Sequence, residues 1–137
     1  MVEADPQNQA VIRSFVAAAG RMVVGGYTTV LEGIVGPWYL DLVREELQAL
    51  GISAHYIVLR PELATCLSRA TGRGRFERVS GHPPLTDEEP LRLLREAFSE
   101  LGVYEGHALD TTGMSHDQTV DSVIELLNDP SQHLLLH

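Results

Sequence analysis

Hydrophobic residues along the chain switch between helical spacing and short β-branched runs, and this alternation predicts the secondary structure. Apolar residues recur at helical spacing in five segments, which begin near Pro6, Trp38, Pro61, Thr86 and Ser115. Between these segments, three short apolar runs predict strands, over residues 27–32, 53–60 and 105–112. Strands that alternate with helices favour right-handed crossovers and a parallel sheet. The sequence therefore predicts an α/β fold, a single three-layer α/β/α domain over residues 1–137 with a small parallel sheet.

Turn and capping residues predict where several helices begin and end. The first helix is expected to end at Gly20 or at the pair Gly25–Gly26, and Gly51 is expected to end the second. Ser115 and Gln118 have the spacing of a capping box before the last helix. Residues 71–85 lack periodicity and are rich in glycine and proline, which predicts a mobile loop.

Composition narrows the class of protein. The chain has 137 residues, 44% of them hydrophobic, with a formal net charge of −9. Such an acidic chain is unsuited to nonspecific nucleic-acid binding, which depends on clustered positive charge. No apolar run approaches the roughly 18 residues of a membrane span, and the acidic N-terminus is unlike a signal peptide. With one cysteine, Cys66, an intrachain disulfide is excluded. We therefore expect a cytoplasmic protein without nucleic-acid or membrane partners.

All ten basic residues are arginines. Codon preference is a sufficient explanation for this bias, but it has a chemical consequence. Without lysine, the chain cannot use a Schiff base, a lysine general base or a phosphate-loop lysine.

The stretch 27–38 is the first candidate site. Its predicted strand ends at Glu32, at the edge of the sheet where open α/β folds bind ligands. A carboxylate there can hold Mg²⁺ through water or take a proton from an acceptor hydroxyl, or it can simply cap a turn or pair with an arginine. Gly36 and Trp38 follow in a loop, where the indole can stack on a substrate ring or pack in the core.

Arginines in and beside the predicted loop form the second candidate site. Their planar guanidinium groups suit phosphoryl oxygens, although a solvated arginine-rich loop is the simpler alternative. Arg69 and Arg73 are four residues apart and share a helix face, which makes them stronger candidates than Arg75 and Arg78.

The third candidate site is the stretch Asp110, Thr111, Thr112 and Gly113, which follows the last predicted strand. It can contact a nucleotide base or ribose. The same residues also suit an ordinary turn before a capped helix, so both interpretations stay open.

In their order along the chain, these parts resemble a P-loop small-molecule kinase. The parts are an acidic strand end with Gly-Ile-Val-Gly-Pro-Trp, a strand running into Leu-Arg-Pro-Glu-Leu, the arginine loop, and Leu-Asp-Thr-Thr-Gly-Met-Ser-His-Asp before the last helix. The nearest families are the zeta-toxin-like and chloramphenicol-phosphotransferase-like AAA-type ATP-binding proteins. The resemblance covers residues 5–128.

This resemblance implies ATP and Mg²⁺ as cofactors and transfer of the γ-phosphoryl group to a hydroxyl of a small molecule. It implies that Glu32 acts as base or metal-shell carboxylate and that Arg69 and Arg73 clamp the phosphate. The remaining implied contacts are with the nucleotide, for Arg75, Asp110, Thr111, Thr112 and Gly113, and with the acceptor substrate, for Gly36 and Trp38.

The sequence departs from this family at its N-terminal end, because it has no strand followed by a G-x-x-x-x-G-K-[ST] loop. Two interpretations follow: an N-terminally shortened kinase impaired in catalysis, or a non-catalytic α/β binding or interaction module that keeps the scaffold. In both, the strands ending at Glu32 and Arg60 are expected to lie side by side. Unpaired strand edges would otherwise favour homo-oligomerisation by borrowing a strand, or would leave the chain unstable.

Overall fold

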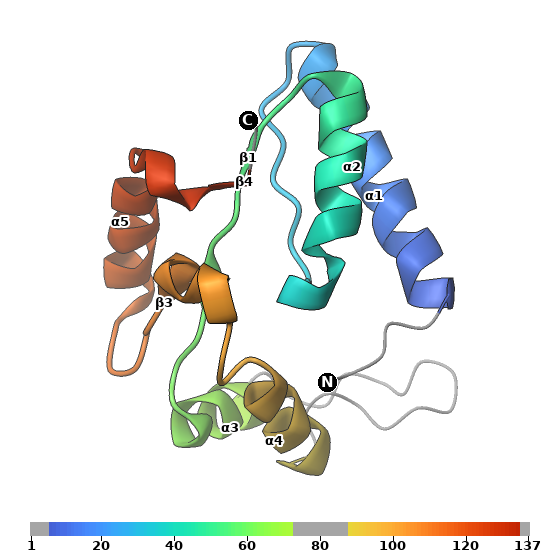
Figure 1. The fold of residues 1–137 in the computed structure, drawn as a ribbon. Helices are drawn as coiled ribbons and strands as arrows, with labels where there is room; N and C mark the ends of the chain where they lie inside the picture. The colour runs from blue at the N-terminus through green and yellow to red at the C-terminus, as the bar shows by residue number, and fades with distance from the viewer. Residues whose placement is uncertain (1–5, 73–87, 135–137) are drawn as a thin grey trace. The chain divides into compact units, whose positions relative to one another are not determined.

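The computed structural model describes residues 6–72 and 88–134, and it divides the chain into two compact units (Figure 1). The N-terminal unit comprises Met1–Tyr56 together with Asp129–His137, and the C-terminal unit comprises Ile57–Asn128. Most of the predicted loop at 71–85 lies outside the described residues, and so do Arg73, Arg75 and Arg78.

Two helices that pack together form the body of the N-terminal unit. Helix α1 spans Pro6–Val24, and α2 spans Leu40–Leu50 after a short 3-10 helix, η1, at Pro37–Tyr39. At Gly20 a Cβ would lie 2.5 Å from Leu50 Cδ1, so glycine allows a close approach to α2 there. Gly20 is therefore a packing position within α1, and the helix ends at the second predicted place, before Gly25.

A pair of two-residue strands joins the two sequence segments of the N-terminal unit. Strand β1, Ala54–His55, pairs antiparallel with β4, His133–Leu134, which follows the short 3-10 helix η3 at Pro130–Gln132. The pairing continues through the Tyr56 N–H, which donates to the Gln132 carbonyl at 2.9 Å. The sequence did not predict this pairing.

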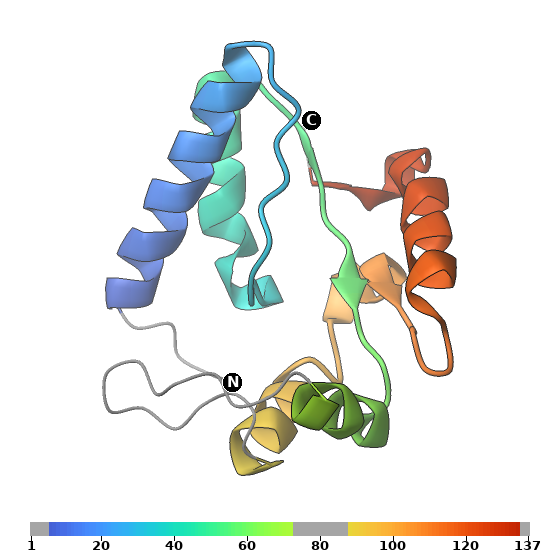
Figure 2. The same cartoon turned by 180° about the vertical axis from the view of Figure 1, so that it is seen from behind.

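Residues 27–32 do not form the predicted strand. They belong to an irregular, exposed segment that runs back beside α2 after α1 ends (Figures 1 and 2). A strand requires hydrogen-bonding partners, and β-branched residues supply only a weak preference for that conformation. The expected pairing of this segment with the strand before Arg60 is consequently wrong.

The C-terminal unit is built around one parallel strand pair. Strand β2, Val58–Leu59, pairs with β3, Ala108–Leu109, so that Val58 is opposite Ala108. The other elements of this unit are α3 at Leu63–Gly72, α4 at Glu88–Ala97, the 3-10 helix η2 at Gly102–His107, and α5 at His116–Leu127. The predicted strand 53–60 is thus divided between β1 and β2, which belong to different sheets.

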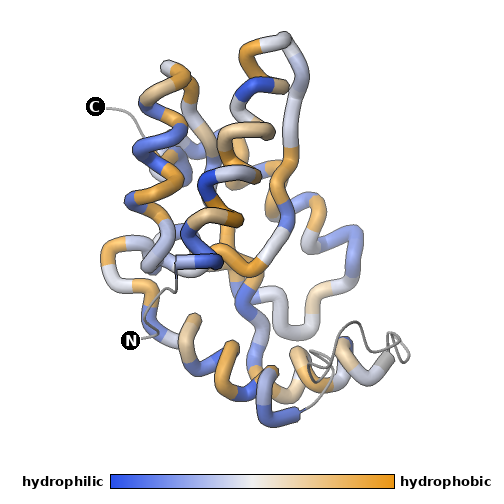
Figure 3. The backbone as a smooth tube through the Cα atoms, turned by 90° about the vertical axis from the view of Figure 1, so that its right-hand side faces the viewer, coloured by the Kyte–Doolittle hydropathy of each residue, from blue (hydrophilic) through white to orange (hydrophobic). Residues whose placement is uncertain are grey.

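Two of the predicted helix ends are confirmed in detail. Gly51 follows α2 with a φ of +66°, in the left-handed region that favours glycine. Ser115 accepts a hydrogen bond from the Gln118 N–H, and the Gln118 side chain accepts one from the Ser115 N–H, which completes the capping box of α5. Along the helices, hydrophobic and hydrophilic residues alternate as their spacing predicts (Figure 3).

The described part of the chain is therefore a helix-rich α/β structure with two small two-stranded sheets. The parallel pair agrees with the predicted class, whereas the three-stranded sheet is absent from the described residues. A single domain with a kinase-like arrangement stays a prediction. Among the described helices, none is long and apolar enough to cross a membrane.

Candidate functional site

The parallel pair β2–β3 brings two predicted site segments to one edge of the C-terminal unit. Parallel strands end at the same edge of a sheet, so Arg60 and Asp110, the residues that follow β2 and β3, lie at a common edge. The Arg60 N–H continues the ladder by donating to the Leu109 carbonyl at 2.8 Å. Helix α3 follows one of these strand ends and α5 follows the other.

Arg69 connects α3 to the loop that follows β3. Its Nη1 donates to Thr111 Oγ1 at 2.9 Å, and its Nη2 donates to the Thr111 carbonyl at 2.9 Å and to the Met114 carbonyl at 3.3 Å. Thr111 is fully buried. Two of the predicted site segments, 42 positions apart in sequence, are thus joined by one guanidinium group.

The loop itself is shaped by local hydrogen bonds. Asp110 Oδ1 accepts from the Thr112 N–H at 2.9 Å, and Thr112 Oγ1 accepts from the Glu62 N–H at 2.8 Å. Gly113 has a φ of +71°, which favours glycine at this turn. The Thr112 hydroxyl and N–H lower the pKa of Asp110 by hydrogen bonding to its carboxylate, and the charges of Arg95 and Arg60 lower it further.

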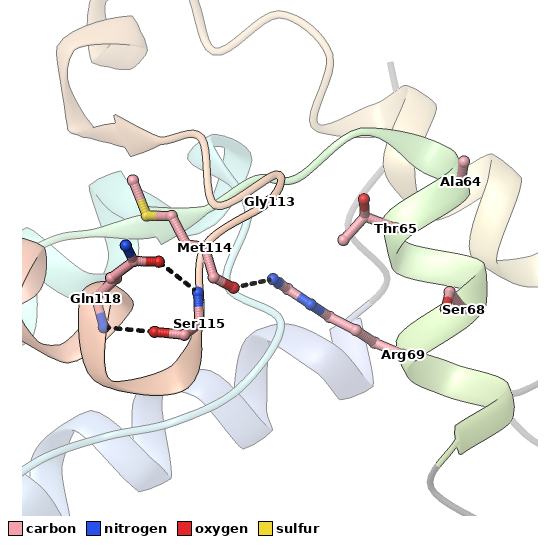
Figure 4. A pocket seen from close by; sticks show the side chains of 8 residues that line it. All are labelled: Ala64, Thr65, Ser68, Arg69, Gly113, Met114, Ser115 and Gln118. Carbon is pink, nitrogen blue, oxygen red and sulfur yellow. Dashed lines mark hydrogen bonds between the residues drawn. The ribbon is translucent and has the colours of Figure 1, made fainter.

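An open pocket of about 590 Å³ lies where Arg69 of α3 meets the loop after β3. One wall is α3, and the other is the turn into α5, as the close view shows (Figure 4). Apart from the apolar Met114, the lining side chains are small, polar or cationic, and none is acidic: Ala64, Thr65, Ser68, Arg69, Gly113, Met114, Ser115 and Gln118. Of the predicted site residues, Arg69 and Gly113 line the pocket directly, and Thr111 accepts hydrogen bonds from Arg69.

An arginine–carboxylate pair at the same edge, Arg60 with Glu105, was missed by sequence reasoning. Arg60 forms an ion pair with Glu105 and also donates to the carbonyls of Phe98 and Ser99, each at 3.2 Å. Chiefly through its hydrogen bond from Arg60, and also through the N–H of Leu101, Glu105 has its pKa lowered to about 2. The position of Arg60 at a strand end was the one signal that could have pointed to this pair.

The other predicted site residues that the structure describes belong to the N-terminal unit. Glu32 is exposed in the irregular segment before η1 instead of closing a strand. Gly36 precedes η1, and a Cβ on it would lie 2.3 Å from the Trp38 ring, so the indole packs against this glycine. Trp38 also contacts the ring of Tyr39, with 5.9 Å between centroids. Packing therefore accounts for both Gly36 and Trp38.

No cluster of three or more metal-ligating side chains occurs within 6–72 and 88–134. Arg73 and Arg75, predicted to contact phosphate and nucleotide, fall outside these ranges.

Comparisons with family models, with curated proteins and with solved structures found no match to this chain.

Proposed function

We propose that the C-terminal unit binds a nucleotide in the pocket between α3 and the turn into α5, as part of a kinase-like phosphotransferase. The proposal rests on one observation. Arg69 and the 110–113 loop were expected from separate stretches to contact phosphate and nucleotide. Two hydrogen bonds from Arg69 to Thr111 join them at the wall of one open pocket, and a third reaches the neighbouring Met114 carbonyl.

The chemistry of the pocket supports an anionic, partly planar ligand. Its lining lacks carboxylates in a chain whose net charge is −9, so an anion meets less repulsion there than over most of the surface. The three hydrogen bonds of Arg69 fix its guanidinium plane, and a fixed planar cation suits stacking on a base. Hydroxyl groups of Thr65 and Ser68 add polar contacts on the α3 side.

ATP and Mg²⁺ fit this chain only in part. The pocket offers groups for a base, a sugar or one phosphate, but the described residues provide no carboxylate cluster for Mg²⁺, and the chain has no phosphate-loop lysine. We therefore propose nucleotide binding for these residues and assign phosphoryl transfer to a hydroxylated small molecule only through the resemblance to kinases.

Isothermal titration calorimetry with ATP, in the presence and absence of MgCl₂, tests this proposal. We expect binding by the natural chain and its loss in Ala64→Glu, because the new carboxylate faces the anion from the exposed side of α3. Ala10→Glu is the matched control, because it adds the same charge at an exposed helical position of the N-terminal unit.

Two results would contradict nucleotide binding at this pocket. One is the absence of heat and of any rise in melting temperature with millimolar ATP. The other is an equal loss of affinity in both variants, which would point to net charge instead of the pocket.

A non-catalytic interaction module is the second candidate function. The observation that favours it lies in the N-terminal unit, where many large apolar side chains are exposed. Absence of nucleotide binding together with defined self-association would favour this alternative.

A further inference from the structure

The N-terminal unit exposes apolar side chains along one continuous part of the chain. We define the N-terminal apolar surface by its nine exposed large hydrophobic residues: Val11, Phe15, Met22, Val23, Val24, Tyr27, Val30, Leu31 and Ile34. All of them belong to α1 or to the irregular segment that follows it.

Helix α1 is apolar on two of its faces. Val16 is buried in the face that packs on α2, whereas a second stripe lies roughly a third of a turn away. This stripe consists of Val11, Phe15, Ala18 and Met22, whose spacings of four, three and four residues match one side of a coiled coil. Phe15 is 57% exposed, which is unusual for a phenylalanine at such a position. Within the described part of the N-terminal unit, the second stripe is therefore exposed.

The segment 28–34 has main-chain groups without backbone hydrogen bonds as well as exposed apolar side chains. Within the described ranges, none of its N–H or C=O groups forms a backbone hydrogen bond. Val30, at the centre of the segment, is 86% exposed. Free main-chain groups on a β-branched, apolar segment are the usual template for pairing with another strand.

The extent of this surface matches what a stable dimer buries. With side chains of this size, the nine exposed fractions amount to about 900 Å² of accessible surface. The largest apolar patch of a typical monomer is about 300–600 Å². A standard protein–protein interface buries about 800 Å² on each partner, so the nine residues together expose about the area of one such interface; Val23, Val24 and Tyr27 contribute to this sum from outside the α1 stripe and the segment 28–34.

Charges at this surface are complementary to each other. Arg21 lies beside the stripe of α1, and Glu32 lies within the irregular segment. In the part of the chain that the structure describes, neither of them forms an ion pair. A two-fold axis presents identical surfaces to each other, so it can place the arginine of each copy against the glutamate of the other.

We propose that the N-terminal apolar surface is the interface of a two-fold symmetric dimer of this chain. The α1 stripe and the segment 28–34 of one copy cover the same features of the second copy. With the two-fold axis perpendicular to these segments, the main-chain groups of the two copies run in opposite directions and can pair antiparallel. This dimer is independent of whether the C-terminal unit binds a nucleotide.

The mass of the natural full chain in solution tests the proposal. Sedimentation equilibrium from low to high micromolar concentration should give twice the mass of one chain. Val30→Asp should weaken the dimer at least about tenfold, because it places a charge in the apolar interface. Val103→Asp is the matched control: it makes the same change at a valine that is 90% exposed in the C-terminal unit, and it should leave the dimer unchanged.

Three outcomes would overturn this dimer: a monomer throughout the concentration range, a polydisperse aggregate without a defined stoichiometry, or equal weakening by Val30→Asp and Val103→Asp. Circular dichroism of both variants establishes that each is folded.

A charge swap tests the ionic contact across the two-fold axis. Arg21→Glu and Glu32→Arg should each weaken the dimer by about threefold to tenfold, and the double variant should regain the natural affinity. If the double variant is as weak as the singles combined, Arg21 and Glu32 do not face each other across the interface.

Discussion

The two units of this chain keep their loops and helices in place by different means. In the N-terminal unit, packing of apolar side chains dominates: among the residues that the structure describes, this unit holds seven of the ten buried hydrophobic ones, and Leu40 is completely buried. The C-terminal unit holds the other three and depends instead on arginines. Arg60, Arg69 and Arg95 donate to five backbone carbonyls, those of Pro61, Phe98, Ser99, Thr111 and Met114.

The difference shows how a unit with a small core can still fix its loops. Loop carbonyls that face away from a sheet need donors, and an arginine can satisfy two or three of them with one rigid fork. Apolar packing offers no hydrogen bonds to such groups. Exposed large apolar side chains occur in both units, nine in the described N-terminal unit and six in the described C-terminal unit, so the units differ in how their loops are held and not in whether they expose apolar side chains.

The largest effect on stability is expected in the core of the N-terminal unit. Leu40→Ala should lower the free energy of unfolding by about 2–5 kcal/mol, because it removes buried methyl groups and leaves a cavity. Urea denaturation measures this loss. Leu93→Ala, at a leucine of α4 that is 60% exposed, should cost less than about 0.5 kcal/mol. Similar losses in both variants would contradict the idea that burial determines what each leucine contributes to stability.

A smaller loss is expected from the arginine that organises the pocket. Arg69→Met should cost about 2–3 kcal/mol, because it leaves the hydroxyl and carbonyl of the buried Thr111 without this donor. Arg92→Met is the control in the same unit, since Arg92 forms only an exposed pair with Glu88 and should contribute less than about 0.5 kcal/mol. Thermal unfolding distinguishes the two variants. Equal losses of stability would show that the hydrogen bonds of Arg69 do not stabilise the contact between α3 and the loop.

Helix ends should contribute similarly in both units. Ser115→Ala removes the cap of α5, and Gly51→Ala forces a Cβ into the left-handed region after α2. Each should cost about 1 kcal/mol in chemical denaturation. Gly106→Ala is the reference, since a Cβ there meets nothing within 4 Å. A cost in only one unit would show that local geometry, too, differs between the units.

The smallest effect is expected at the partly exposed pair of Arg60 and Glu105, and it should depend on pH. The pKa of Glu105 lies at about 2, below its ordinary value of 4.5, so the pair stabilises the fold above pH 4.5. That contribution is lost as the pH falls towards 2. Glu105→Gln should therefore be less stable than the natural chain at neutral pH, and the difference should vanish near pH 2. Thermal unfolding across this range measures it, and a difference that persists at pH 2 would contradict the assignment.

Features set by neighbouring residues could be predicted from the sequence. The helices follow from apolar spacing, and the caps at Gly51 and Ser115 follow from local geometry. Strand pairing depends on distant partners, so residues 27–32 have the composition of a strand without forming one. The predicted strand 53–60 is divided for the same reason, because β1 pairs with β4 and β2 pairs with β3.

The candidate site was predictable only where residue type and position agreed. Arg69 and the 110–113 loop stood out because an arginine at a helix end and a turn after a strand are both recognisable locally. The pair of Arg60 and Glu105 was missed because 45 positions separate them and no spacing rule connects such residues. Glu32 was selected for a strand end that does not exist.

The pairing of β1 with β4 has a consequence for the order of folding during synthesis. All residues of the C-terminal unit leave the ribosome before β4 does. β1 is made early but can pair with β4 only after the intervening 77 residues, more than half of the 137, have been synthesised. Joining such distant segments also costs loop-closure entropy, which is smaller once the intervening residues have folded into a compact unit. The C-terminal unit is therefore expected to fold first, and the N-terminal unit to complete its small sheet only afterwards.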